Sequence, residues 1–380
     1  GMNPNLKPEK TSSIEAGFEA AFWDNRLYLD FTYYKTDSRN QILKLATTAA
    51  SGYTSQVRNA GHIRNRGYEI QLGAVPIQTS KGFRWNLDLN YGANSSKVVK
   101  LDDEGLITSY QLYSSGIQIL ASVGEAYGTL FGTSYVRDAN GNVVVDANGL
   151  PKISTTNKTL GKFTPDWTGG ISNTFSYRSL SLSFLIDASV GGSIFSNTNK
   201  TGKYTGVLAN TLSGRDAEHG GLWYYTDAMG NNVRLPESPS YSVSSDGLYY
   251  AQVNGQSTRV YQDGIMVEGV TESGSKNEEV VSAEKYYHRI YSIAEANVYD
   301  ASYVKLREVA LSYRLPRLWT QKLHLQEASV TLTGRNLWTI YKSVPNIDPE
   351  SALTTGNAQG VEAYSLPTTR SFGVNLSVKF

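Results

Sequence analysis

The last ten residues of the chain, Ser371 to Phe380, alternate strictly between polar and apolar side chains. The apolar members are Phe372, Val374, Leu376, Val378 and Phe380. A period of two over this length predicts a β-strand with one apolar face and one polar face. About ten residues is also the length that a tilted strand needs to cross a lipid bilayer. The fold must therefore accommodate a long, two-faced strand.

The same alternation recurs along the whole chain and predicts about nine strands. They are expected around residues 14–22, 27–33, 68–74, 83–94, 167–177, 180–190, 300–315, 328–333 and 371–380. The clearest covers residues 83–94, where one face is apolar and the other carries Arg84 and Asp88. Charged side chains need water, so that face is predicted to be a surface or a wet lumen. In the seventh strand the phase slips near Arg307 and Glu308, which predicts a β-bulge or a segment above the membrane.

Short and long connections alternate between these strands. Short turns are predicted at residues 24–25, 77–82, 178–179 and 316–322, and long loops at residues 35–66, 95–165, 192–297 and 341–367. Outer-membrane barrels have short periplasmic turns and long extracellular loops, whereas a β-sandwich need not sort its loops by end. The predicted fold is all-β: the C-terminal portion of a transmembrane β-barrel, with about nine antiparallel strands and long extracellular loops. The longest loop is expected to be irregular.

The ends of the sequence fit this interpretation. Single-chain bacterial barrels close with an even number of strands, so about nine strands predict at least one more upstream of Gly1. The pair Gly1-Met2 resembles an artificial start, and earlier parts of the protein are expected to be missing. In bacterial outer-membrane barrels, a closing strand that ends in Phe is the usual assembly signal. Phe380 is expected to be that signal.

Composition excludes several other classes of function. Charged residues make up 18% of the chain and the formal net charge is +1, which gives no electrostatic case for a nucleic-acid partner. The chain has no Cys, so no disulfide framework and no thiolate site are possible. Its 4 His are scattered, without the spacing of a metal site or a catalytic triad. No nucleophile elbow, P-loop or dinucleotide fingerprint is present. We therefore expect no enzyme activity, no cofactor and no metal site.

Aromatic residues gather in the long loops as well as in the strands. The candidates for ligand or partner contact are Trp223, Tyr224, Tyr225, Tyr249, Tyr250, Tyr286 and Tyr287. Flat rings flanked by amides and carboxylates suit the faces and hydroxyls of sugars, or a peptide backbone. The alternative is that these rings pack the loops onto one another or onto a partner. Strand aromatics such as Trp85 and Trp167 are instead expected to form a girdle at the lipid interface.

Six short motifs occur in a fixed order along the chain. They are Asn3-Pro-Asn-Leu-Lys-Pro-Glu-Lys10, Asn65-Arg-Gly-Tyr-Glu-Ile70, Asp300-Ala-Ser-Tyr-Val-Lys-Leu-Arg307, Gly334-Arg-Asn-Leu-Trp338, Asn346-Ile-Asp-Pro-Glu350 and the strand ending at Phe380. In this order the chain resembles the C-terminal part of SusC-like TonB-dependent transporters. Those are the large outer-membrane porters of Gram-negative Bacteroidetes, so the resemblance implies an outer-membrane location.

The resemblance implies a barrel of about 22 strands, of which residues 1–380 would supply the last nine or so. It also implies an N-terminal plug and a TonB-contacting segment, both missing from this sequence, and a SusD-like surface lipoprotein over the barrel mouth. The implied function is part of a nutrient importer for oligosaccharide or peptide. The alternative is a soluble or cell-surface β-rich module that binds glycans. A β-sandwich glycosidase would need paired catalytic carboxylates, which the sequence does not mark out.

Overall fold

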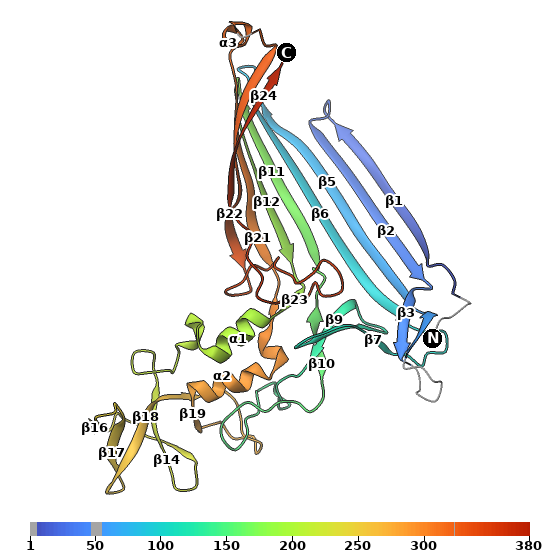
Figure 1. The fold of residues 1–380 in the computed structure, drawn as a ribbon. Helices are drawn as coiled ribbons and strands as arrows, with labels where there is room; N and C mark the ends of the chain where they lie inside the picture. Colours follow the sequence, from blue (N-terminus) through green and yellow to red (C-terminus); the bar gives the residue numbers. More distant parts are fainter. Residues whose placement is uncertain (1–5, 47–54, 323) are drawn as a thin grey trace.

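The computed structural model describes residues 6–46, 55–322 and 324–380 of the chain. Within them, nine strands form one antiparallel sheet in the order β1-β2-β5-β6-β11-β12-β21-β22-β24 (Figure 1). The strands are β1 (Lys10–Phe22), β2 (Leu27–Arg39), β5 (His62–Gln78), β6 (Phe83–Lys100), β11 (Trp167–Tyr177), β12 (Leu180–Val190), β21 (Tyr303–Arg314), β22 (Glu327–Lys342) and β24 (Ser371–Lys379). The prediction of about nine antiparallel strands is confirmed.

One face of this sheet carries the apolar residues of the alternating pattern. A row of directly paired residues crosses six strands through Leu29, Leu72, Leu89, Ile171, Ile186 and Leu306. Aromatic rings pair on the same face, as where the ring centroids of Trp85 and Phe175 lie 5.6 Å apart. Cross-strand pairs of this kind stabilise a sheet by about 0.2–1 kcal/mol each. The register therefore keeps the apolar side chains together.

Asn173 is a polar residue on this apolar face, between Leu87 and Phe184 on the neighbouring strands. Its side chain is buried, and its Oδ1 accepts a hydrogen bond of 3.0 Å from Nε1 of Trp85. An unpaired amide in an apolar setting would cost about 1–3 kcal/mol. The Trp85 indole removes that cost for the amide oxygen.

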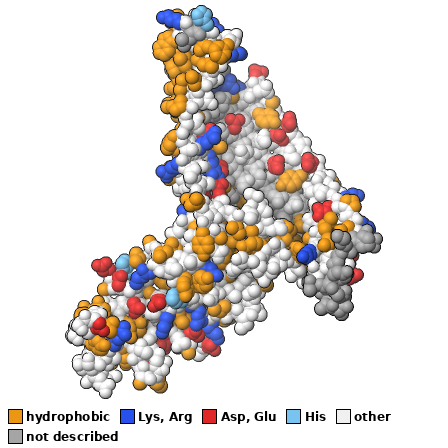
Figure 2. Space-filling view, viewed as in Figure 1, with side chains coloured by type: hydrophobic (Ala, Val, Ile, Leu, Met, Phe, Trp, Pro, Cys, Tyr) orange, Lys and Arg blue, Asp and Glu red, His pale blue; other side chains and the backbone are white. Residues whose placement is uncertain are grey.

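The opposite face of the sheet is polar. Glu19 lies opposite Asp30, which lies opposite Gln71, and Gln71 pairs with Asn90. In contrast, the apolar face has no covering layer among the described residues, since Phe372 is 80% exposed and Leu376 is 66% exposed. Figure 2 shows hydrophobic side chains along the outer margin of the part of the sheet where β21, β22 and β24 lie. The predicted division into an apolar face and a wet face is confirmed.

The connections sort by end of the sheet, but their bounds differ from the prediction. Short turns at residues 23–26, 79–82 and 178–179, and a turn with helix α3 (Arg317–Lys322), lie at one end, and the long connections lie at the other (Figure 1). These long connections span residues 40–61, 101–166, 191–302 and 343–370, rather than 35–66, 95–165, 192–297 and 341–367. β2, β5 and β6 run further than predicted because their loop-side ends are mostly polar, which hides the alternation.

The end of the β2–β5 pair shows what holds such an extension together. Asp37 on β2 accepts hydrogen bonds from Nε of Arg64 at 2.8 Å and pairs with Nε2 of His62 at 2.5 Å. Both partners lie on β5, beyond the predicted strand. Charge-assisted hydrogen bonds across the ladder take the place of apolar contacts there.

The long connections are folded rather than irregular, so the prediction for residues 192–297 was wrong. Residues 101–166 hold a four-stranded sheet of β7 (Ser109–Ser114), β8 (Gln118–Ser122), β9 (Tyr127–Gly132) and β10 (Lys158–Lys162). Residues 191–302 hold helices α1 (Asn197–Thr205) and α2 (Ala283–Tyr291) and the 3-10 turns η2 (Ala209–Thr211) and η3 (Ala294–Asn297). Most strands of these connections have three to six residues, too few to show a clear alternating pattern.

A six-stranded sheet, here the distal sheet, lies farthest from the barrel strands. It consists of β14 (Leu222–Thr226), β15 (Asn232–Arg234), β16 (Tyr241–Val243), β17 (Tyr249–Val253), β18 (Gln256–Met266) and β19 (Val280–Ser282). Figure 1 shows it beyond the two helices, at the tip of the 191–302 insert. The first long connection contains only the hairpin of β3 (Ile42–Ala46) and β4 (Ser55–Asn59) among its described residues.

The 191–302 insert is closed at its base by strand pairing. β13 (Ser193–Ser196) pairs antiparallel with β20 (Val298–Asp300), which places Ser193 opposite Asp300. β13 also pairs in parallel with β23 (Val361–Glu362) of the 343–370 connection. The two ends of the insert are thus held side by side, next to a neighbouring loop.

The main buried cluster lies among the loops rather than on the sheet. Its members are Ile117, Ile119, Leu130, Phe195, Ala294 and Val361. They come from three long connections, so burial of these side chains joins the inserts into one body, which we call the loop assembly. In the described part of the chain, no helix combines the length and the apolar character that a membrane crossing requires.

Candidate functional site

A cluster of charges joins the barrel strands to the 343–370 connection. Nζ of the buried Lys305, on β21, lies 2.6 Å from Oδ1 of Asp348 and 2.6 Å from Oε2 of Glu350. The hydroxyl of Tyr303 donates to Glu350 Oε1 at 2.9 Å. We call this cluster, together with Arg307 and Asp187, the rim network.

Arg307 completes the rim network from a bulge in β21. On one side Leu306 and Glu308 pair with Ile186 and Leu185, and Arg307 is skipped in both neighbouring ladders. Its Nε donates to Asp187 at 2.7 Å, and its two terminal nitrogens donate to the Glu350 carboxylate. The phase slip predicted near Arg307 is therefore a β-bulge, and it directs a guanidinium at a carboxylate in the bidentate geometry that suits both.

The carboxylates of the rim network stay charged over a wide pH range. Burial alone would raise the pKa of Asp348, but hydrogen bonds from Lys305 Nζ and Thr368 lower it to about 2. Burial also opposes the ionised form of Glu350, and hydrogen bonds from Arg307 and Lys305 bring its pKa below the ordinary value. Two partly buried carboxylates facing two cations form an ionic lock that persists at neutral pH.

Several of the motifs meet at this rim. Nδ2 of Asn346 donates to Oδ1 of Asn199 on α1 at 2.8 Å, and Asn199 returns a 3.0 Å hydrogen bond to the carbonyl of Pro345. Nδ2 of Asn336, on β22, donates to the carbonyl of Thr369 at 3.1 Å. Motifs far apart in sequence thus fix the loop assembly to the barrel. Residues 3–5 of the first motif lie outside the described residues.

The predicted aromatic contacts divide into two groups. Trp223, Tyr224, Tyr225, Tyr249 and Tyr250 lie together in the distal sheet, whereas Tyr286 and Tyr287 lie on α2. In the second group the ring centroids are 5.2 Å apart, and the Tyr287 hydroxyl donates to the carbonyl of Asn210 at 3.0 Å. The sequence analysis treated all seven aromatic residues as one set of candidates. It did not predict that five of them lie in one sheet and the other two on a helix.

Two of the five distal-sheet rings are buried. Trp223 packs with Ala251 and Val260, and its ring centroid lies 5.7 Å from that of Tyr249. Tyr224 stacks on Tyr261 at 5.1 Å and donates its hydroxyl to Asp263 at 2.9 Å. Trp223 and Tyr224 therefore hold the sheet together. A direct contact with ligand or partner is left to their exposed neighbours, and that role stays a prediction.

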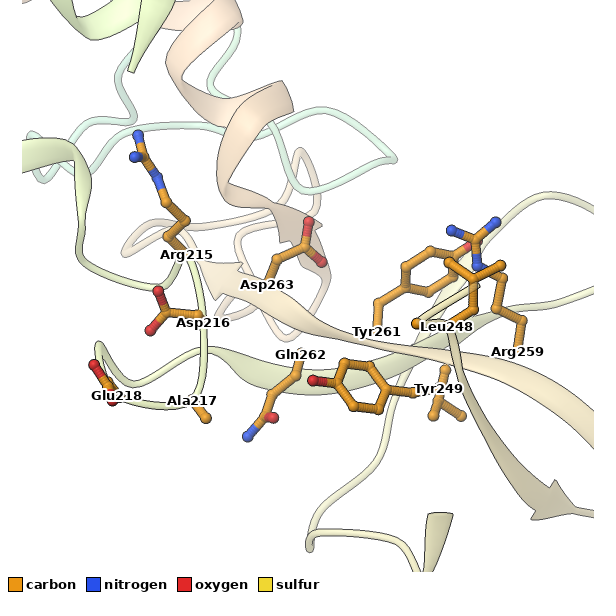
Figure 3. A pocket seen from close by; sticks show the side chains of 12 residues that line it. Arg215, Asp216, Ala217, Glu218, Leu248, Tyr249, Arg259, Tyr261, Gln262 and Asp263 are labelled. Carbon is orange, nitrogen blue, oxygen red and sulfur yellow. The ribbon is translucent and has the colours of Figure 1, made fainter. Parts of the chain in front are cut away.

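Exposed Tyr249 borders a cavity of about 410 Å³ at the base of the distal sheet (Figure 3). The cavity is lined by residues 215–218, 247–249 and 259–263. Sequence reasoning found Tyr249 but missed Arg259, Tyr261 and Gln262, which follow one another along β18. The sequence sign that could have revealed them is the run of polar and aromatic residues in β18. It was overlooked because this stretch was expected to be irregular.

A second cavity, of about 600 Å³, lies between α1, α2 and β18. It shares Arg215 and Asp263 with the first, so the two are neighbours. Arg215 donates hydrogen bonds of 2.8 Å to the carbonyl of Gly206 and to Oγ1 of Thr211. The shared wall is thus held in place by contacts with the α1 end and the following turn.

The sheet and its loops define a class of protein. An antiparallel sheet with an uncovered apolar face, a polar opposite face, short turns at one end and folded loops at the other is the wall of a transmembrane β-barrel.

The chain belongs to the TonB-dependent receptor-like β-barrel family, whose model matches residues 1–337. It is similar to the TonB-dependent receptor P3 of Formosa agariphila, with 27% identity over all of this chain and 35% of the relative. It is also similar to the TonB-dependent receptor SusC of Bacteroides thetaiotaomicron, with 25% identity over all of this chain and 33% of the relative. The chain therefore spans about a third of the length of these relatives.

Solved structures show the same fold. A structure of the RagAB peptide transporter matches all of this chain and 36% of its own, with a TM-score of 0.62 and 19% identity. The same importer in its "open-open" state matches with a TM-score of 0.63 and 19% identity. The SusC-like resemblance and the barrel fold are confirmed. The family is one of outer-membrane transporters rather than of enzymes.

Proposed function

We propose that the full-length protein imports an oligosaccharide or a peptide through the outer membrane, with energy supplied by TonB. The observation that carries this proposal is the family match over residues 1–337. The polar face of the sheet fits it, because a transport lumen must be wet. The alternative, a soluble glycan-binding module, is disfavoured because such a module would bury its apolar sheet face against a second layer.

We propose further that the loop assembly is the docking surface for a SusD-like lipoprotein and the upper wall of the ligand chamber. Three long connections share one buried cluster, and the rim network ties them to β21. A surface that must hold a partner over the barrel mouth needs that rigidity. Aromatic anchors such as exposed Tyr249 and its neighbour Tyr241 typically contribute about 2 kcal/mol or more each at interfaces.

The experiment removes the distal sheet from the full-length protein. Leu222 and Ser282 both pair with Gly264, one on each side, so their backbones lie about 10 Å apart. A Gly-Ser linker of about four residues spans that gap and can replace residues 223–281. We expect normal insertion into the outer membrane, loss of lipoprotein capture in a pull-down, and loss of growth on the cognate nutrient.

The matched control carries the same linker inserted between Asn254 and Gly255, at the tip of the β17–β18 hairpin, where nothing is removed. It should capture the lipoprotein and support growth like the unaltered protein. If the deletion variant also captured its partner and grew normally, the distal sheet would have no part in docking or in uptake.

A milder change is the simultaneous replacement of Trp223, Tyr224 and Tyr225 by Ala. Because two of these rings are buried, the distal sheet should lose its packing while the barrel, which does not contact them, inserts as before. Weaker capture or slower uptake with unchanged barrel heat-modifiability on gels is the expected result. Normal capture and normal growth would mean that the rings serve only to pack this sheet.

A further inference from the structure

The cavity beside Tyr249 is lined by several hydrogen-bonding groups that have no partner among the described residues. The side chains of Glu218, Arg259 and Gln262 and the hydroxyls of Tyr249 and Tyr261 line it. Within the described residues, none of these side-chain groups has a hydrogen-bond or ion-pair partner. Other groups of the wall are satisfied: Asp216 pairs with Nδ1 of His219 at 2.7 Å, and Asp263 accepts from Tyr224. The free groups are thus a distinct set, carried on a fixed frame.

The free groups border one cavity, but from different ends of it. Figure 3 shows the Tyr249 ring and the Gln262 side chain on the side of Ala217 and Glu218, with Tyr261, Leu248 and Arg259 at the other end. The Arg259 guanidinium lies over the Tyr261 ring, 4.8 Å from its centroid, and that ring is stacked on buried Tyr224. The aromatic wall is therefore backed by the core of the distal sheet.

The chemistry of the wall selects a class of ligand. An aromatic ring offers its face to the C–H groups of a sugar ring, and carboxylate, amide, guanidinium and phenol groups together meet several hydroxyls. Two arginines and three carboxylates line the cavity, so its charges nearly balance and favour a neutral ligand. A volume of about 410 Å³ falls within the usual range of small-ligand sites, about 300–1,000 Å³.

A peptide fits the same wall less well. Extended peptides are commonly bound by adding a strand to an open sheet edge, through backbone hydrogen bonds. Here the strand that supplies most of the wall, β18, lies inside its sheet between β14 and β17. The free groups that the cavity offers are side-chain groups.

We propose that this cavity is a surface subsite for one ring of a neutral oligosaccharide, which it captures at the tip of the loop assembly, outside the barrel lumen. The neighbouring cavity between α1, α2 and β18 shares Arg215 and Asp263 with this one, so we expect a longer chain to reach both. The proposal deepens the proposed function, because it names the substrate class, and it rests on that function only for its biological purpose.

The test uses the full-length protein in detergent and hydrogen–deuterium exchange. The probes are uncharged hexasaccharides of glucose, mannose, xylose and galactose, with trialanine as the peptide probe. At least one hexasaccharide should slow exchange in residues 247–263. Gln262→Ala should weaken that binding about fivefold, the effect of one lost hydrogen bond. Tyr249→Ala should weaken it about tenfold.

Two further variants control for folding. Gln252→Ala removes an exposed amide from the same sheet, outside the cavity, and should bind like the unaltered protein. Tyr249→Phe keeps the ring against Trp223 and removes only the hydroxyl, so a moderate loss with an intact sheet separates contact from stability. No protection by any hexasaccharide, protection by trialanine instead, or equal affinity in all variants would overturn the proposal.

This outcome is separable from that of the proposed function. Lipoprotein capture and growth are not measured in the exchange experiment, so a failed docking proposal leaves the sugar measurement interpretable. Conversely, normal capture with no sugar protection would overturn the subsite alone.

Discussion

Replacing Lys305 with Met in the full-length protein tests the rim network most directly. The Lys305 side chain is 3% exposed and faces two carboxylates at 2.6 Å. Removing the cation leaves Asp348 without an ion-pair partner among the described residues, because Arg307 pairs with Glu350 and Asp187. Breaking a buried pair in this way costs about 3–5 kcal/mol. We expect the 343–370 connection to lose its attachment to the barrel by roughly 3 kcal/mol.

The pKa of Asp348 gives an independent magnitude. Its value of about 2, against an ordinary 3.8, corresponds to about 2 kcal/mol of stabilisation of the carboxylate. Because the folded-state pKa is lowered, this contribution is present above about pH 4 and is lost as the pH falls through about 2. The stabilisation of the Asp348 carboxylate alone is smaller than the loss expected on removing Lys305. That difference is expected, because the lysine pairs with two carboxylates.

The assay is hydrogen exchange of the backbone amides of residues 344–362. A loss of about 3 kcal/mol should raise the rate of exchange through local opening about a hundredfold. The amides of β11 and β12 should keep their protection. The triple variant Lys305→Met, Asp348→Asn and Glu350→Gln should recover much of the loss, because no unpaired buried charge remains. Unchanged exchange in Lys305→Met, or an equal loss in β11 and β12, would refute the view that this cluster is a local lock.

Two predictions concern the apolar face of the sheet. Leu89→Arg, in the middle of β6, should lower barrel stability by about 2–4 kcal/mol, measured by urea unfolding in lipid vesicles. Asn90→Arg, on the polar face, should lower it far less. Equal effects of the two changes would exclude the assigned orientation of the sheet. Trp85→Phe should destabilise the barrel by about 1–3 kcal/mol because the Asn173 side chain loses its hydrogen-bond donor. Adding Asn173→Leu should restore most of the lost stability. Additive losses in the double variant would show that the two side chains act separately.

The barrel strands could be predicted from sequence because their pattern is local. Each strand shows its two faces through its own alternation, and even the bulge at Arg307 appeared as a slip of phase. Strand ends could not be placed, because residues such as Asp37 and Arg64 are held by each other across the ladder and break the pattern on both faces. Pairing between residues 27 positions apart leaves no trace in either segment alone.

The structure of the loop assembly could not be predicted from sequence, because it also depends on contacts between residues far apart in the chain. Trp223 and Tyr224 were candidates for ligand or partner contact, with loop packing as the alternative, and the sequence could not decide between the two. Trp223 is buried by Ala251 and Val260, and Tyr224 stacks on Tyr261. Lys305, Asp348 and Glu350 were visible within motifs, but their meeting depends on a connection that folds back over the barrel. Long-range contacts between short elements decide this part of the molecule, and short elements carry little periodic signal.

The pairing of Ser193 with Asp300 holds the two ends of the 191–302 insert together, so the insert can be replaced by another of different length or structure. The chain leaves and re-enters the barrel wall at adjacent points, so the β13–β20 pair separates the wall from the rest of the insert. Selection can therefore lengthen, shorten or replace what lies beyond the contact without altering the register of β12 and β21. A transporter built in this way can acquire a new specificity at its surface while its membrane-spanning part stays the same.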